Sequence, residues 1–392
     1  MRLLSRYVIR QLLTVFLFSL FGMTVVMILV GVVREALDKS LGVVQIAQLL
    51  PYILPDALRF AIPATILFAT CSVYGRMSSA NEIVAVKSMG ISPMKLLWPT
   101  YVVVAVISLV AVYLNDVAVS WGRDGVRRVV IESLEEVAYN VLAKEKSFSQ
   151  GQFAINVRDV EGKRLLRPTV TFQSGENTPS ITIRAEWAEL HADPRANTLT
   201  ILLHNGNASG GGVNMEFPGT IERVLPISPE DAHDRRSASS MPLADIPSAI
   251  VRQQELITDL QQQIAAEAGI AMIAGDYFSG ENESWKSTNA VLDRAVWHFH
   301  RLQTEPHRRW ASGLSCLCFV AVGAPLAIRL KNSDFLTSFF LCFLPILLVY
   351  YPLLMFGLDR AKNGALPPET VWLGNVVLLV AGALMLRKVI RY

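Results

Sequence analysis

Few residues of this chain could do chemistry, and those that could do not form a catalytic motif. The only Gly-Lys pair, Gly162-Lys163, is followed by Arg164, and Val157 stands where a phosphate-binding loop would have its first glycine. Such a loop needs glycines whose backbone amides surround the phosphates, and a lysine followed by serine or threonine. We therefore expect no ATP hydrolysis by this chain.

The histidines and cysteines do not suggest a metal site either. His298 and His300 are two residues apart, so they do not share a face of a helix, and no His-Glu-x-x-His motif is present. The four cysteines all lie in or beside apolar segments: Cys71, Cys316, Cys318 and Cys342. Their spacing fits neither a zinc site nor a disulfide framework. We expect no catalytic residues, no metal and no cofactor.

The most informative polar stretch runs from residue 74 to residue 92. Ser79 and Glu82 have the spacing of a capping box, apolar residues follow, and Gly90 is suited to end a helix. The pattern predicts a short amphipathic helix over about 78–90. Such a helix is either a plain interfacial helix or a docking element for a partner protein.

Six apolar blocks surround this stretch and account for the composition of the chain. The 392 residues are 52% hydrophobic and 18% charged, whereas soluble domains carry about 25% charged residues. Each block approaches the roughly 20 residues that cross a bilayer as a helix: 12–33, 53–74, 97–119, 311–328, 335–357 and 371–386. In the second block, Asp56 and Arg59 are spaced to pair on one helix face. The first block is too long for a signal peptide, so we expect it to be retained.

The basic residues predict the orientation of these spans. If the N-terminus is cytoplasmic, the cytoplasmic segments hold eleven lysines and arginines and the short outer loops hold four. Basic residues accumulate on the cytoplasmic side of membrane proteins. Both termini are therefore expected in the cytoplasm, with residues 120–309 on the opposite side. The net charge of +3 gives no reason to expect nucleic-acid binding.

The long outer segment has three parts. Residues 121–146 read as helical, and residues 147–226 alternate apolar and polar side chains as half-buried strands do. Turn residues separate these short strands, which predicts a sandwich or jelly-roll domain. A proline-rich linker then leads to helices at 250–267 and 289–303, which could pair as a hairpin.

Together these features resemble the LptF/LptG family of lipopolysaccharide-export permeases over essentially the whole chain. The stretch from Gly75 to Gly90, with Glu82 in its middle, is similar to the family's coupling helix. The Leu54-Pro55 and Ile62-Pro63 pairs resemble its second span. Residues 305–311 and 323–327 are similar to the start of its fourth span. One departure is the region 231–305, which is longer and more helical than expected.

The resemblance implies a membrane α-helical fold with six transmembrane helices. A periplasmic all-β jelly-roll-like domain and extra helices would be inserted between helices 3 and 4. The expected divisions are 1–120 for the first three spans, 121–230 for the β-domain, 231–309 for a linker and helices, and 310–392 for the last three spans.

The resemblance also implies partners and a task. The chain would pair with a second homologous permease and with a cytoplasmic ABC ATPase dimer in the bacterial inner membrane. It would extract lipopolysaccharide or a related glycolipid and pass it to periplasmic bridge proteins of similar β-fold. It would be a transporter subunit and not an enzyme.

Site residues follow from the same resemblance. Arg76, Ser79, Glu82 and Gly90 would couple the permease to the ATPase, with Glu82 transmitting its motion. Arg34 would meet a lipid phosphate, since a guanidinium binds phosphate oxygens bidentately. Alternatively, Arg34 is an ordinary interfacial residue that pairs with an acidic neighbour.

The apolar face of the strand domain could contact acyl chains or form only the domain core. Its candidate residues are Phe153, Ile155, Ile181, Ile183 and Trp187. Two other classes of function stay open. A membrane-anchored periplasmic scaffold or sensor would need an output domain, and the cytoplasmic segments are short. An intramembrane enzyme would need polar groups within the bilayer, but Asp56, Arg59 and Asp116 lie near span ends.

Overall fold

The computed structural model describes most of the chain. The described residues are 2–39, 43–122, 125–126, 128–129, 138–139, 141–144, 146–150, 153–172, 181–193, 198–210, 213–226, 238–273, 283–330 and 335–391. At some element ends only the backbone is described. The side chains of Arg34, Phe153 and Ile181 belong to this group, so these three predictions lie outside the described side chains.

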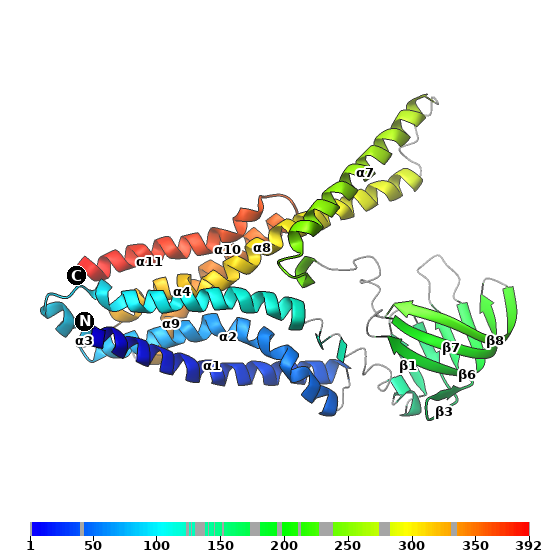
Figure 1. Cartoon of the computed structure of the whole chain (residues 1–392), viewed down its shortest axis with the longest axis horizontal. Coiled ribbons are helices and arrows are strands. Elements are labelled where there is room, and N and C mark those ends of the chain that lie inside the picture. Colours follow the sequence, from blue (N-terminus) through cyan, green and yellow to red (C-terminus); the bar gives the residue numbers. More distant parts are fainter. Residues whose placement is uncertain are drawn as a thin grey trace. The chain divides into compact units, whose positions relative to one another are not determined.

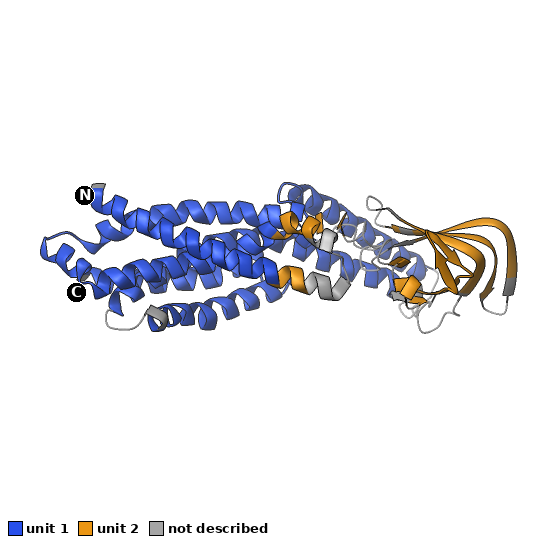
Figure 2. Ribbon diagram, turned by 90° about the horizontal axis from the view of Figure 1, so that it is seen from below, with its two compact units in different colours: residues 1–29, 54–122, 237–392 blue, residues 30–53, 123–236 orange. Residues whose placement is uncertain are grey.

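The chain divides into two compact units (Figure 2). The first comprises residues 1–29, 54–122 and 237–392, and the second comprises residues 30–53 and 123–236. The first unit is helical and the second contains the β-sheet, so each is described by itself.

The helices of the first unit follow the apolar blocks of the sequence. They are α1 (Arg2–Lys39), α2 (Val43–Ser79), α3 (Glu82–Ser88), α4 (Pro93–Val117), α7 (Ile246–Ile273), α8 (Glu283–Arg329), α9 (Phe335–Pro345), α10 (Tyr351–Lys362) and α11 (Leu373–Arg391). The ends of α1 and α2 that adjoin residue 40 are assigned to the second unit. Three short helical segments adjoin these helices. The π-helical segments Ala118–Gly122 and Ile346–Tyr350 follow α4 and join α9 to α10, respectively, and the 3-10 segment Pro368–Trp372 precedes α11.

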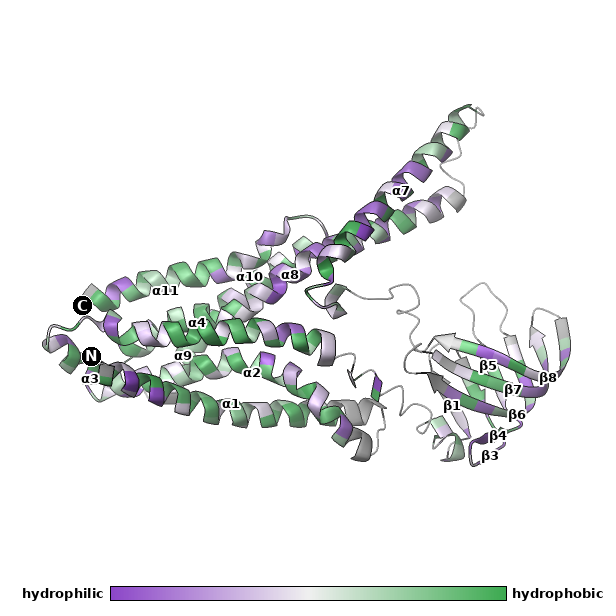
Figure 3. Ribbon diagram, viewed as in Figure 1, coloured by the Kyte–Doolittle hydropathy of each residue, from purple (hydrophilic) through white to green (hydrophobic). Residues whose placement is uncertain are grey.

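The six predicted spans are confirmed. Six helical segments are long and apolar enough to cross a membrane: Leu3–Val33, Ala47–Ser79, Pro93–Gly122, Trp285–Arg329, Thr337–Lys362 and Pro368–Ile390. In the apolar window of the fourth, 72% of the residues are buried, against 11% in the first. The part of α8 within the bundle is therefore central, whereas α1, which is largely apolar (Figure 3), has exposed apolar side chains such as Leu17, Phe18 and Phe21. The predicted pair of Asp56 and Arg59 also forms, with 2.8 Å between Oδ1 and Nη2.

The two helices predicted before the fourth span form a hairpin. Helix α7 packs along the first half of α8, where Gln253 Nε2 donates to the carbonyl oxygen of Ala295 at 2.9 Å. Both helices are longer than predicted. The second is not a separate element, because α8 continues for 47 residues from the hairpin into the span, through Pro306 and Pro325.

The second unit contains an antiparallel β-sheet that curves into a half-barrel (Figure 1). Its eight strands are β1 (Ser147–Gln150), β2 (Phe153–Asn156), β3 (Asp159–Glu161), β4 (Arg164–Leu166), β5 (Thr169–Phe172), β6 (Ile181–Asp193), β7 (Thr198–Gly210) and β8 (Val213–Pro226). Strand β6 pairs with β5 and β4 along one edge and with β7 along the other. The all-β prediction for residues 147–226 is confirmed, in the form of one open sheet.

A short helical segment covers part of this sheet. Of the helix predicted over 121–146, residues 125–126, 128–129, 138–139 and 141–144 are described and are helical. Tyr139 donates its hydroxyl to the carbonyl of Lys163 at 2.7 Å and accepts the Leu190 amide at 2.9 Å. Leu142 packs in the same buried cluster. By contrast, Met215 and Val224 on β8 are exposed, so the core covers only part of the sheet.

Candidate functional site

The short helix between spans two and three begins later than its sequence pattern predicts. Ser79 belongs to the last turn of α2, where its hydroxyl donates to the carbonyl of Arg76 at 3.0 Å. The cap residue of α3 is Asn81, in a left-handed conformation with φ 57° and without a side-chain cap hydrogen bond. Asparagine tolerates this conformation better than most residues. The prediction that Ser79 and Glu82 form a capping box is therefore wrong, because Ser79 lies within the preceding helix, α2.

The end of α3 follows the prediction for Gly90. This glycine has φ 74°, and its amide donates to the carbonyl of Lys87 at 2.9 Å. The amide of Ile91 donates to the carbonyl of Val86 at 3.2 Å. These two hydrogen bonds form a Schellman motif, which needs a left-handed residue after the helix. The resulting helix, Glu82–Ser88, is shorter than the predicted range of about 78–90.

Helix α3 is attached to the bundle on its inner side. Ile83 and Val86 are buried, and Lys87 Nζ donates to the carbonyl of Val389 at the end of α11 at 2.9 Å. Next to α3, the Ser78 hydroxyl donates to the carbonyl of Ile328 at the end of α8 at 2.7 Å. The first contact places a cation at a helix C-terminus, where the helix dipole favours it. The hydrogen bond from Lys87 therefore holds α3 to α11, and the one from Ser78 holds the adjoining end of α2 to α8.

The four predicted coupling residues lie around this attachment. Arg76 and Ser79 are exposed in the last turn of α2, Glu82 is half-buried in the first turn of α3, and Gly90 is exposed at its end. A carboxylate in a first helical turn is favoured by the helix dipole. Arg76 and Ser79 share a hydrogen bond through the Arg76 carbonyl. The exposed groups leave this end of the bundle free to meet another molecule.

A buried charge cluster lies at the opposite end of α4. Arg309 on α8 is 1% exposed and donates from Nη1 to Asp116 Oδ1 on α4 at 2.6 Å. Its Nη2 donates to the carbonyl of Met241 at 2.6 Å, and the Leu243 amide donates to Asp116 Oδ1 at 2.9 Å. The cluster thus ties α4 and α8 to the segment that precedes α7.

A second ion pair completes this cluster within α8. Arg308 donates from Nε and Nη2 to Glu305 Oε2 at 2.9 and 2.7 Å, and Arg309 Nε lies 3.9 Å from the same oxygen. The cluster therefore contains two cations, Arg308 and Arg309, and two carboxylates, Glu305 and Asp116. Buried charges are stable only when they are paired and hydrogen-bonded, and this arrangement provides both conditions for Arg309.

Sequence reasoning missed this cluster. Asp116 and Arg309 are 193 positions apart, so no local spacing connects them. The available signal was the occurrence of charged residues at the borders of two apolar blocks. Charged groups at such borders are often paired within the protein.

The predicted acyl-contact residues are only partly brought together. Ile155 is fully buried and lies opposite Val170, which in turn lies opposite Ile183, so these residues form one cross-strand row. Trp187 is half-buried and stacks on His204, with ring centroids 3.6 Å apart. The guanidinium of Arg164 lies 4.7 Å from the Trp187 ring. Ile155 belongs to the core of the sheet, whereas Trp187 is accessible from outside.

A comparison with known protein families gives one match. The family model described as "Lipopolysaccharide export system permease LptF/LptG" matches residues 6–388. The match includes the spans, α3, the sheet and the helical hairpin. No match to a curated protein was found.

Proposed function

The chain belongs to the LptF/LptG family of lipopolysaccharide export permeases, and from this premise we propose how it works within the export system. The family resemblance of the sequence is confirmed, and the chain is a multi-pass membrane subunit of a transporter, not an enzyme. This result sets aside the scaffold, sensor and intramembrane-enzyme hypotheses.

The proposed partners are those that the sequence suggested. A second related permease completes the membrane part, and a cytoplasmic ABC ATPase dimer supplies the energy. Periplasmic bridge proteins of similar β-fold accept the lipopolysaccharide or related glycolipid. The excess of basic residues on one side supports an inner-membrane orientation with both termini in the cytoplasm.

The proposed contact with the ATPase is α3. Support comes from the turn between α2 and α3, where Arg76, Ser79 and Glu82 are accessible to a partner. On the inner side, Lys87 of α3 is hydrogen-bonded to the end of α11, and Ser78 of α2 is hydrogen-bonded to the end of α8. A partner that displaces Glu82 therefore acts on α11 through Lys87 and on α8 through the adjoining end of α2. The permease alternates between arrangements closed and open to lipid, and ATP shifts this balance only by the partner's differential affinity for them.

The proposed lipid path uses residues on the other side of the membrane. Arg34, near the end of α1, meets the phosphates of the lipid, which suit a guanidinium. The apolar residues of the sheet contact the acyl chains. Among them, the accessible Trp187 supports this role better than the buried Ile155.

Glu82→Lys tests the coupling role. Because the carboxylate lies in the first turn of α3 and is partly accessible, reversal of its charge is expected to stop export while the protein still folds and inserts. Export of labelled lipopolysaccharide from vesicles containing the complete transporter measures the effect. Glu369→Lys is the matched control, since Glu369 is also an accessible acid in a first helical turn, before α11. Normal export by the Glu82→Lys protein would disprove the coupling role.

Purification of the tagged chain in mild detergent tests the partners. Mass spectrometry of the co-purifying proteins and lipids is expected to find an ABC ATPase, a second permease and bound glycolipid. A stable, folded chain that carries no ATPase would contradict the proposed assembly.

A further inference from the structure

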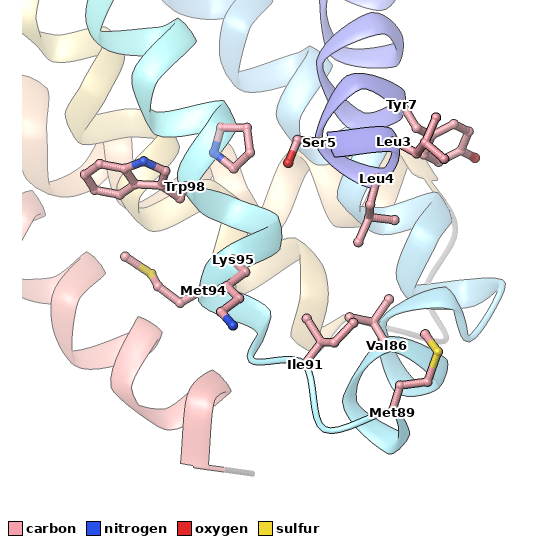
Figure 4. Close-up of a pocket in the computed structure, with 11 residues that line it drawn as sticks. Leu3, Leu4, Ser5, Tyr7, Val86, Met89, Ile91, Met94, Lys95 and Trp98 are labelled. Atoms are coloured by element: carbon pink, nitrogen blue, oxygen red, sulfur yellow. The ribbon is translucent and has the colours of Figure 1, made fainter. Parts of the chain in front are cut away.

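An apolar groove lies beside α3, at the end of the bundle where α1 begins (Figure 4). Leu3 and Tyr7 of α1 form one wall, Val86 and Met89 form the floor, and Met94 and Trp98 of α4 form the other wall. Its volume is about 850 Å³. This space is large enough for part of a lipid, which makes the chemistry of its rim informative.

The rim of the groove has the composition of a membrane interface. Trp98 is 61% exposed and Tyr7 is 42% exposed. Aromatic side chains with a polar atom are enriched where the hydrocarbon of a bilayer meets its headgroups. Two such side chains at one end of the spans suit a groove at the level of the headgroups of one leaflet.

The groove is continuous with a lipid-facing stripe along α4. Trp98, Val102, Val106 and Leu109 are exposed and follow one another at intervals of three or four residues. Residues at this spacing share one face of a helix. An amphiphile whose polar end lies in the groove could thus extend its chains along this face, into the bilayer.

The charge at the groove favours an anion. Lys95, one turn before Trp98, lines the groove and is exposed. Among the described residues that line the groove, none is acidic. An ammonium group near a membrane surface attracts anionic lipids by about 1 kcal/mol.

We propose that this groove binds an anionic phospholipid, with its phosphate at Lys95 and its acyl chains along Trp98 and Val102. The two residues of the floor belong to or adjoin α3, so a bound lipid supports α3 from the membrane side. The site is distinct from the proposed path of the exported lipid and needs no ATPase.

Fluorescence quenching by brominated lipids tests this proposal on the full chain. The chain is reconstituted into vesicles of equal amounts of phosphatidylglycerol and phosphatidylcholine, with bromine on the acyl chains of only one of them. The share of quenching that belongs to Trp98 is the difference between the unmodified chain and Trp98→Phe. Random contact with the bilayer quenches equally in both vesicles, whereas a selective site prefers brominated phosphatidylglycerol.

We expect a preference of about fivefold for phosphatidylglycerol, the effect of one cation of roughly 1 kcal/mol. Lys95→Glu is expected to remove this preference. Lys388→Glu is the matched control and is expected to retain it, because Lys388 is an exposed lysine near the end of α11, outside the groove. Circular dichroism of each variant confirms that it is folded.

Three results would overturn the proposal. Equal quenching of Trp98 by the two lipids would show that the groove has no anionic selectivity. A preference that survives in Lys95→Glu would place the selectivity elsewhere. Protection of Trp98 from both lipids would show that a protein, such as a second copy or a partner subunit, covers the groove.

Discussion

The two ends of the helical bundle are held together by different kinds of contact. At one end, Arg309 is buried and joined to Asp116 and the Met241 carbonyl by directed hydrogen bonds. At the other end, α3 rests on buried apolar residues and on one hydrogen bond to the end of α11, beside an open groove, and the adjoining end of α2 makes one hydrogen bond to the end of α8. Directed bonds between buried charges have one favourable geometry, whereas apolar contacts tolerate small displacements.

This difference suggests which end of the bundle can move at low cost. Separation of Arg309 from Asp116 would leave the buried guanidinium of Arg309 without its nearest carboxylate, so α4 and α8 are expected to move together at that end. A shift of α3 would exchange one set of apolar contacts for another. The end that meets the proposed ATPase is thus the deformable one, and the end near the charge cluster is a fixed point.

Among the substitutions that test this difference between the two ends, Arg309→Leu is expected to destabilise the chain most. Breaking a buried charge pair costs about 3–5 kcal/mol, and Arg309→Leu removes the cation that bonds Asp116 and lies beside the buried Glu305. We expect a loss of this size in the free energy of unfolding, measured by denaturant titration in mild detergent. Arg164→Leu is the control, since Arg164 and its partner Glu189 are 62% and 37% exposed, and an exposed pair contributes at most about 1 kcal/mol. Equal losses in the two variants would show that the cluster is not a special anchor.

Gly90→Ala should give an intermediate effect at the deformable end. A side chain in the left-handed conformation costs about 1–2 kcal/mol, so the turn after α3 becomes strained. Gly75→Ala is a control that is expected to change stability in the opposite direction, because Gly75 lies within α2 and an added Cβ would meet no atom within 4 Å. This substitution should stabilise the chain by about 0.5–1 kcal/mol. The two variants are compared in the same unfolding assay, and a gain in stability in Gly90→Ala would contradict the strained turn.

The smallest loss of stability is expected when the exposed ion pair of Lys146 and Asp159 at the sheet is broken. Because this pair is charged but not buried, it shows how much charge contributes without burial. A hydrogen bond from Lys146 lowers the pKa of Asp159, with support from the Val160 amide. A lowered pKa in the folded state stabilises the protein above the ordinary aspartate pKa, and this contribution is lost as the pH falls through the lowered value.

Thermal unfolding of the β-sheet, followed by circular dichroism, measures this contribution. Asp159→Asn should unfold at a slightly lower temperature than the unmodified chain at neutral pH, and the difference should decline as the pH falls below about 4 and vanish below the lowered pKa of Asp159. A difference that grows as the pH falls would reverse the assigned sign. A loss of stability as large as that expected for Arg309→Leu would show that burial does not make the Arg309 cluster more stabilising than an exposed ion pair.

Local patterns were sufficient to predict most elements of the fold. The spans follow from apolar blocks, the strands from alternation, and the end of α3 from Gly90, because each depends on neighbouring residues. The uninterrupted α8 was not predicted: the sequence pattern indicates a helix over 289–303 and a separate span over 311–328, with Pro306 and the charged pair Arg308-Arg309 between them. Asp116 neutralises Arg309 from another helix, so the helix passes through without exposing that charge.

The candidate sites were harder to predict for the same reason. The four proposed coupling residues lie within 15 positions of one another, from Arg76 to Gly90, so one local pattern predicts them together. The groove combines α1 with α3 and α4, and the charge cluster combines α4 with α8. Such pairings depend on how the helices pack, which a single sequence does not contain.

The continuity of α8 makes it a lever arm that pivots near Arg309. About 26 of its residues precede this arginine, which at about 1.5 Å per residue gives an arm of roughly 39 Å. A tilt of the span by about 10° would carry the far end of the hairpin through roughly 7 Å, more than the pitch of one helical turn. A slight tilt of the span is thereby enlarged toward the hairpin, and Pro306, just before the pivot, is where the arm can bend most readily.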